Sequence, residues 1–183
     1  PDSGNAGIGI DGIIFDGNKT DDDNIPGQWG VYFRLCRNLV IRDCTFRNAA
    51  SDGLTLEYTR DSTISGCIAE GNVKPGIYLS GCDRILVTGC QVHNCVSPIA
   101  YGIALACSWY CTVSANIVSG CLNGSIGLTR DCRFNAVVGN SIESIGVEPE
   151  PIGNYDLLYF RLVQRPGRGT EPVVSGGARA YGA

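Results

Sequence analysis

The stretch "GIYLSGCDRILVTGCQVHNC", residues 76–95, contains three short segments in which apolar and polar residues alternate. Ile77 and Leu79 lie in the first segment and Val87 lies in the second, with glycine and polar residues between segments. A period of two predicts short β-strands. The same stretch holds three cysteines and the chain's only histidine, His93. Thiolate and imidazole are the ligands of zinc sites, so the local spacing alone raises a zinc site as one interpretation.

This stretch is one of five similar segments. They begin at Gly30, Gly53, Gly76, Gly102 and Gly127, at intervals of 23, 23, 26 and 25 residues. A shorter version precedes them at residues 8–18, and residues 155–163 and 171–182 resemble a further unit. Apolar residues recur in the same columns, here meaning equivalent positions of successive units: Val31/Phe33, Leu54/Leu56, Ile77/Leu79 and Ile103/Leu105, then Ile41, Ile64, Val87, Val113 and Val138. About three strands per unit at a fixed period predict an all-β solenoid, a parallel β-helix.

The repeats resemble the right-handed parallel β-helix superfamily that includes pectate lyases. The short "GIxL…xxVxxCxxxxN" coils are most similar to those of phage tailspikes and related polysaccharide-processing proteins. The resemblance implies one domain, residues 1–183, of about six or seven coils of roughly 23 residues each. The clear coils are expected at 8–145, an acidic loop at 19–29, and a last coil with a capping or inter-subunit tail at 146–183. Because this fold hosts lyases, hydrolases, epimerases and inert fibres, it does not by itself define an activity.

Composition narrows the function classes. The 183-residue chain carries a net charge of −4 and only 17% charged residues, which argues against nucleic acid as a partner. No apolar run approaches the roughly 20 residues that span a bilayer, so we expect no membrane segment. The chain starts at Pro1 without a signal peptide, which suggests processing or excision from a longer protein.

The cysteines fall into columns rather than into one cluster. Fourteen residues after successive repeat glycines stand Cys44, Cys67, Cys90 and Asn116; further columns hold Cys95 with Cys121, Cys36 with Cys82, and Cys107 with Cys132. Neighbouring coils lie about 4.8 Å apart, so stacked cysteines would pack as small buried apolar side chains. Disulfides between adjacent coils and a zinc site are the alternatives. His93 falls in an outward column with Arg47, Glu70 and Ser119, interpreted as a surface ladder or an acid–base pair.

In the superfamily, substrates usually lie along the outward face of the first strand of each coil. That face here is predicted to present Tyr32, Thr55, Tyr78 and Ala104, and beside them Arg34, Glu57, Ser80, Ala106 and Asp131. The next turn adds Arg37, Arg60, Asp83 and Trp109, then Asn38, Asp61, Arg84 and Tyr110. Aromatic rings stack on apolar sugar faces while charged groups bind hydroxyls. We therefore predict a polysaccharide partner, bound by Tyr32, Tyr78, Trp109, Tyr110 and Trp29.

Glu57 is the best candidate for an acid or base, with Asp83, Arg34 and Arg60 as the other candidate catalytic residues. An arginine partner favours the ionised carboxylate, which suits a base or nucleophile. A hydrolase needs two carboxyl groups about 5–9.5 Å apart; Glu57 with Asp83 could supply them, whereas Asp131 would lie three coils away, about 14 Å. A lyase would use Arg34 or Arg60 as its base. The alternative is structural: Arg34–Glu57, Arg60–Asp83 and Asp61–Arg84 as ion pairs between coils.

No metal site is predicted, but Asp21, Asp22 and Asp23 of the acidic loop could bind calcium weakly, and otherwise serve as a solvated turn. Similarity to tailspikes suggests a homotrimer at an extracellular or virion surface. The sequence thus predicts a polysaccharide-directed domain of a spike, fibre or secreted protein, either a lyase or hydrolase. The alternative is a non-catalytic structural or glycan-binding scaffold.

Overall fold

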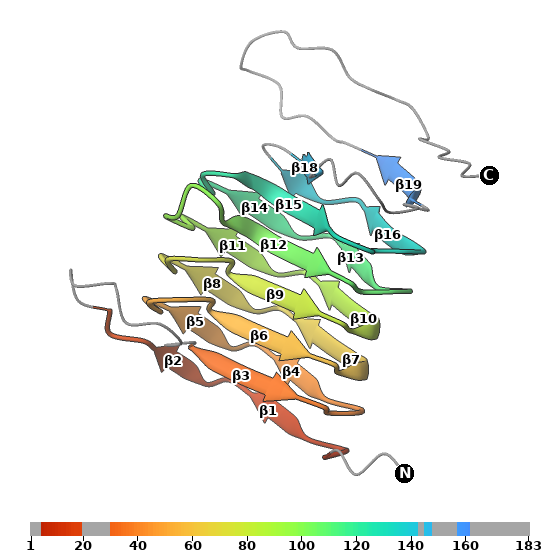
Figure 1. Cartoon of the computed structure of the whole chain (residues 1–183). Helices are drawn as coiled ribbons and strands as arrows, with labels where there is room; N and C mark the ends of the chain where they lie inside the picture. The colour runs from red at the N-terminus through yellow and green to blue at the C-terminus, as the bar shows by residue number, and fades with distance from the viewer. Residues whose placement is uncertain (1–4, 20–29, 143–144, 148–156, 162–183) are drawn as a thin grey trace, which may run out of the picture.

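The computed structural model describes residues 5–19, 30–142, 145–147 and 157–161, and within them every regular element is a β-strand. The strands stack in parallel into three sheets that run the length of a solenoid (Figure 1). Sheet A contains, in spatial order, β1 (Gly9–Asp11), β4 (Val40–Arg42), β7 (Arg60–Ser65), β10 (Asp83–Thr88), β13 (Thr112–Ser114), β16 (Asn135–Val138) and β19 (Leu157–Arg161). Sheet B contains β2 (Ile14–Asp16), β5 (Thr45–Arg47), β8 (Ile68–Glu70), β11 (Gln91–His93), β14 (Ile117–Ser119) and β17 (Ser141–Ile142). Sheet C contains β3 (Val31–Arg34), β6 (Leu54–Glu57), β9 (Ile77–Ser80), β12 (Tyr101–Ala106), β15 (Gly124–Thr129) and β18 (Ile145–Val147).

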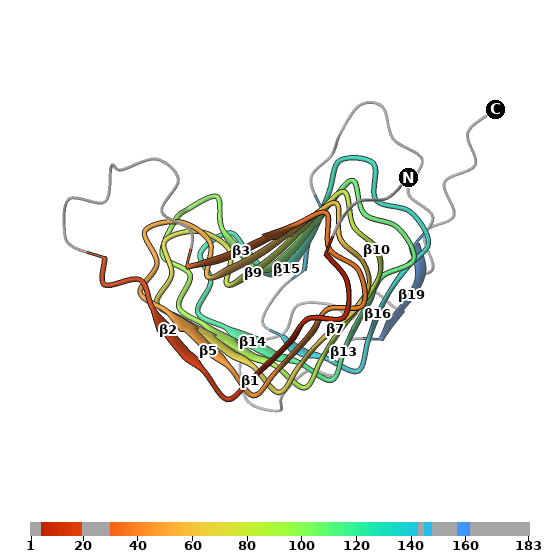
Figure 2. The ribbon, with the colours of Figure 1, turned by 90° about the horizontal axis from the view of Figure 1, so that it is seen from below.

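Each coil passes from sheet C to sheet A to sheet B, so that the three sheets form three walls around one core (Figure 2). Successive coils are in register: Ile41, Ile64, Val87, Val113 and Val137 occupy one column of sheet A. The predicted parallel β-helix is confirmed. The described residues contain five complete three-strand coils with part of a coil at each end, compared with the six or seven expected.

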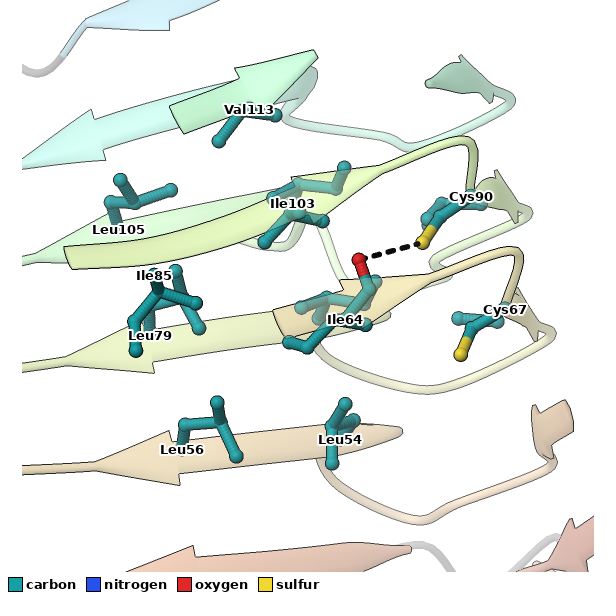
Figure 3. Packing of buried hydrophobic residues seen from close by; sticks show 14 of the residues in the cluster. Leu54, Leu56, Ile64, Cys67, Leu79, Ile85, Cys90, Ile103, Leu105 and Val113 are labelled. Atoms are coloured by element: carbon teal, nitrogen blue, oxygen red, sulfur yellow. Dashed lines mark hydrogen bonds between the residues drawn. The ribbon is translucent and has the colours of Figure 1, made fainter. Parts of the chain in front are cut away.

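The core lies inside the three walls and consists of the inward residues of every strand. Leu54 and Leu56 of β6 and Leu79 of β9 are fully buried and stack along the solenoid axis on Ile103 and Leu105 of β12 (Figure 3). Each such side chain contributes about 1.5–3 kcal/mol when it leaves water. Alternation therefore fixes direction: the residue between two core leucines points outward.

The alignment of the fifth repeat on Gly127 is wrong. Ile103 pairs with Ile126, so the residue equivalent to Gly102 is Ser125. A shift of two residues preserves the alternation of a strand, and the pattern alone could not exclude it. The following turn is also one residue longer, so that Val137 is buried at 3% exposure while Val138 points outward at 36%.

Asparagines reinforce the corners between sheets. Asn72, Asn116, Asn135 and Asn140 are buried, and each accepts a hydrogen bond from a backbone N–H of the preceding coil at 2.8–3.0 Å. Each side-chain amide also donates to a backbone carbonyl at 2.8–3.1 Å. These side chains satisfy backbone groups that turn away from the sheets.

The cysteine columns are largely as predicted. Cys44, Cys67 and Cys90 occupy one column, which Asn116 continues, and Cys67 and Cys90 lie one above the other beside the apolar core (Figure 3). All ten cysteines are free, and eight of them are buried. Burial raises the pKa of Cys82 to about 11. The column of Cys107 with Cys132 is wrong: the pairing of Trp109 with Arg133 places Cys132 beside Ser108.

The described residues contain no group of three or more histidine, cysteine or acidic side chains arranged to hold a metal ion. They also contain no helix that is long and apolar enough to cross a membrane.

Candidate functional site

The outward face of β3, β6 and β9 carries the predicted groove residues, and we call it the tyrosine face. It consists of two columns, Tyr32–Thr55–Tyr78 and Arg34–Glu57–Ser80. The register of the three strands fixes these columns, because the buried residues Leu54, Leu56, Ile77 and Leu79 alternate with them along β6 and β9. Three of the predicted site residues, Tyr32, Arg34 and Glu57, come directly together here.

Glu57 is the centre of a polar network on this face. Its carboxylate accepts a hydrogen bond from the Tyr32 hydroxyl. It also forms an ion pair with Arg34, whose Nε lies 3.2 Å from Glu57 Oε2. The bond to Glu57 raises the pKa of Tyr32, because the carboxylate stabilises the protonated hydroxyl. The Arg34 guanidinium also lies 5.7 Å from the centre of the Tyr58 ring, within cation–π range. The expected Arg34–Glu57 ion pair is therefore present.

Asp52 is a second carboxylate at this face that sequence reasoning missed. It is only 5% exposed, and the Thr55 hydroxyl donates a hydrogen bond to its Oδ2 at 2.9 Å. A signal was available, because Asp52 is the only acid directly before a repeat glycine; the residues at that position of the other coils are Trp29, Pro75, Tyr101 and Gly124. Buried carboxylates near a surface are candidate functional groups.

Tyr78 borders Thr55 on the opposite side from Tyr32. It is half-buried, and burial raises its pKa. The two tyrosines therefore flank the Thr55–Asp52 pair along the solenoid axis. One ring is exposed and the other is partly enclosed.

Beyond Tyr78 the outward face of sheet C is buried and offers no exposed side chains on β12. Ala104 and Ala106 of β12 are buried, and an added Cβ at Gly127 would overlap the Tyr101 ring. The column of Glu57 continues to Thr129 and not, as predicted, to Asp131. Asp131 instead pairs with Arg133 at 2.7 Å. The tyrosine face is thus confined to the first three complete coils.

The remaining predicted residues lie past the corner from sheet C to sheet A. Asp83 begins β10 and is aligned with Arg60 and Trp109, whereas Glu57 ends a strand of sheet C. The Asp83 carboxylate contacts Arg84, which also forms the expected pair with Asp61 at 2.6 Å. In the register of the sheet Asp83 faces Arg60, as the predicted Arg60–Asp83 pair requires.

Tyr110 follows Trp109 at the same corner, two coils beyond Glu57. The structure therefore separates Trp109 and Tyr110 from the tyrosine face. Trp29 and Asp21–Asp23 lie outside the described residues.

His93 lies on the outward face of sheet B, in register with Glu70 and Ser119 as predicted. Its Nδ1 is 2.8 Å from Ser119 Oγ. Because sheet B forms another wall of the solenoid, this pair is separate from the tyrosine face (Figure 2).

Comparison with known proteins agrees with the geometry. The sequence pattern described as "Right handed beta helix region" matches residues 2–142. The chain belongs to the right-handed β-helix family. This β-helix is similar in structure to the A-module of the mannuronan C-5 epimerase AlgE4 of Azotobacter vinelandii, with a TM-score of 0.61 over 83% of the chain. The sequence identity is 14%, so the likeness concerns the fold, and the β-helix spans 46% of that chain. No curated protein matches the sequence significantly.

Proposed function

We propose that this β-helix is a polysaccharide-directed domain of a spike, fibre or secreted protein, and that it holds its glycan on the tyrosine face. The observation that carries the proposal is the arrangement of Tyr32 and Tyr78 on either side of Thr55, with the Arg34–Glu57 pair in the adjacent column. The location that follows is an extracellular or virion surface, where polysaccharides are found. Sedimentation equilibrium tests the homotrimer expected of a spike.

The chemistry of the face suits a sugar chain. The rings of the exposed Tyr32 and the half-buried Tyr78 offer apolar area that can stack on pyranose faces. The Arg34–Glu57 pair offers charged donors and acceptors for hydroxyl groups, and charge-assisted hydrogen bonds are about twice as strong as neutral ones. The structurally similar epimerase module is named for its action on mannuronan, a polysaccharide, which supports the same class of ligand.

A second candidate function is hydrolysis of that polysaccharide, which the two carboxylates Asp52 and Glu57 favour. Thr55 binds Asp52 and lies two residues before Glu57 on the same face, a step of about 6.6 Å along a strand. Hydrolases place their carboxyl groups about 5–9.5 Å apart. The pair Asp52 and Glu57 is therefore a candidate for this spacing on one face, whereas Asp83 lies around the corner in sheet A. A lyase would instead draw its base from Arg34 or Arg60.

A panel of capsular, pectic and alginate-type polysaccharides tests the proposal. Each polymer is included in a native gel, and the retardation of the protein in that gel measures binding. Each polymer is also incubated with the protein, and new reducing ends and the absorbance of unsaturated uronates measure cleavage. We expect retardation by at least one polymer, weakened in Glu57→Gln. The matched control is Glu70→Gln, which changes a carboxylate on sheet B. Equal retardation of Glu57→Gln and wild type would refute binding at this face.

The two chemistries give different products. New reducing ends without unsaturation, lost in Glu57→Gln and in Asp52→Asn, support hydrolysis. Unsaturated ends support a lyase, and binding without either product supports a non-catalytic glycan-binding scaffold.

A further inference from the structure

A group of aromatic side chains lies exposed at the corner between sheets C and A, and we call them the corner aromatics. They are Tyr58, Trp109, Tyr110 and Phe134, with exposures of 52%, 37%, 57% and 38%. Tyr58 comes from the second complete coil, and Trp109, Tyr110 and Phe134 come from the fourth and fifth, where Tyr110 and Phe134 share a column along the solenoid axis. Exposed rings in a row are not needed for the core, which lies on the other side of the wall.

The backbone does not favour aromatic residues at these positions. Tyr58, Tyr110 and Phe134 have φ values of +49°, +54° and +55°, in the left-handed region that bulky residues rarely adopt. Equivalent corner positions in other coils also have positive φ, and they carry Gly81 and Asn38 as well as Leu35, Arg84 and Cys107. The turn therefore fixes this backbone conformation, and the aromatic residues place rings on it.

The corner aromatics form a rigid surface. The rings of Tyr110 and Phe134 are stacked, with centroids 5.0 Å apart and planes within 11° of each other. The Trp109 indole N–H donates to the Asp131 carbonyl at 3.1 Å, which fixes the ring against the next coil. A ligand that binds here meets side chains that are already ordered, so binding sacrifices little conformational entropy.

Paired charges border the rings. Arg84 with Asp61 lies one coil before Tyr110, and Arg133 with Asp131 lies beside Phe134. A guanidinium carries five donors in a planar fork and a carboxylate carries two acceptor oxygens, a combination that suits hydroxyl groups. The corner thus combines apolar rings with hydrogen-bonding groups, as the tyrosine face does.

The corner adjoins the tyrosine face at Tyr58, because Arg34 binds Glu57 on that face and lies over the Tyr58 ring. Tyr110 and Phe134 share a column on adjacent coils, about 5 Å apart, whereas the column of Tyr58 continues to Gly81. A surface that repeats along one axis suits a ligand that also repeats along its length.

We propose that the corner aromatics are a second contact surface for the polysaccharide, which lies against the exposed parts of their rings. The inference rests on the proposed function, because the same polymer occupies both surfaces. The ligand contacts are the Tyr58, Tyr110 and Phe134 rings, with Arg133 as a donor to hydroxyl oxygens.

The test uses Tyr110→Asn with Phe134→Asn in the full chain. Asparagine tolerates positive φ, so this double variant removes the rings and keeps the corner conformation. The matched control is Leu35→Asn, which replaces an exposed residue at φ +56° on the first complete coil. Affinity is measured by native electrophoresis in gels that contain the polysaccharide retarding the wild type most strongly. We expect the double variant to bind about tenfold more weakly, with the control and the melting temperatures unchanged.

The outcomes separate this inference from the proposed function. Weaker binding in Glu57→Gln with wild-type binding in the double variant overturns the corner surface and leaves the tyrosine face. Wild-type protein that no polysaccharide retards overturns both. A double variant that changes only the sedimentation behaviour shows that the corner binds another copy of the chain, which also overturns the inference.

Discussion

Replacing Asn116 by alanine tests how the corners of the solenoid are held. Asn116 is 1% exposed, and its Oδ1 accepts the N–H of Cys90 at 2.9 Å while its Nδ2 donates to the Val87 carbonyl at 3.1 Å. Alanine keeps the fold's backbone conformation available but leaves both of these groups in the preceding coil without a partner. Each buried backbone group that loses its partner costs about 1–3 kcal/mol, so we expect a loss of about 2–6 kcal/mol in the free energy of unfolding.

Cys67→Ala is the matched control. Cys67 occupies the same column two coils earlier, and its thiol lies 3.4 and 3.9 Å from backbone carbonyls and contacts the Cys90 thiol. Removing one buried sulfur should cost about 1–2 kcal/mol, because no backbone group loses a strong partner.

The assay is urea unfolding followed by far-ultraviolet circular dichroism, with the slope m compared among the variants. Similar slopes with a lower midpoint for Asn116→Ala than for Cys67→Ala would support the reasoning. If Asn116→Ala proves no less stable than Cys67→Ala, the corner hydrogen bonds do not stabilise the solenoid as described.

Three further results are expected. In the native protein a disulfide reagent should modify only Cys107 and Cys121 rapidly, because the other eight thiols are buried; rapid reaction of more than two would contradict the cysteine columns. Gly127→Ala should cost about 1–3 kcal/mol in urea unfolding, since its Cβ would overlap the Tyr101 ring, and most of that loss should vanish in a Tyr101→Ala background. Because hydrogen bonding raises the pKa of Tyr32, its contribution to stability is complete below the ordinary tyrosine pKa of 10.0 and is lost as the pH rises above it. The urea midpoint of the wild type should therefore fall between about pH 8 and about pH 11, and it should fall less in Tyr32→Phe. An equal fall in both proteins would count against the hydrogen bond from Tyr32 to Glu57.

The repeat period was enough to predict the fold. Alternation predicts that Leu54 and Leu56 point inward, and the 23-residue interval aligns Cys67 with Cys90, as the strand register does. It failed at the fifth coil because Gly127 resembles a repeat glycine, while its actual constraint is the ring of Tyr101 from the neighbouring coil. Such a contact between coils leaves no trace in the alternation of a single strand.

The candidate site was predictable in part. The ion pair of Arg34 with Glu57 follows from register alone, since the two residues share a column on adjacent strands. The bond from Tyr32 to Glu57 crosses from one column to the next, and column reasoning does not detect diagonal contacts. The column of Arg60, Asp83 and Trp109 also follows from the repeat, but the direction in which the turn carries it does not, and the corner places Asp83 in sheet A.

The claim that the tyrosine face holds the glycan is tested most directly by oxidative footprinting with mass spectrometry. The protein is labelled with hydroxyl radicals in the presence and absence of the polysaccharide that retards it most strongly. We predict that the polymer protects Tyr32 and leaves the exposed Ile14 and Ile117 of sheet B unchanged. Protection of Ile14 and Ile117 with full labelling of Tyr32 would contradict the account.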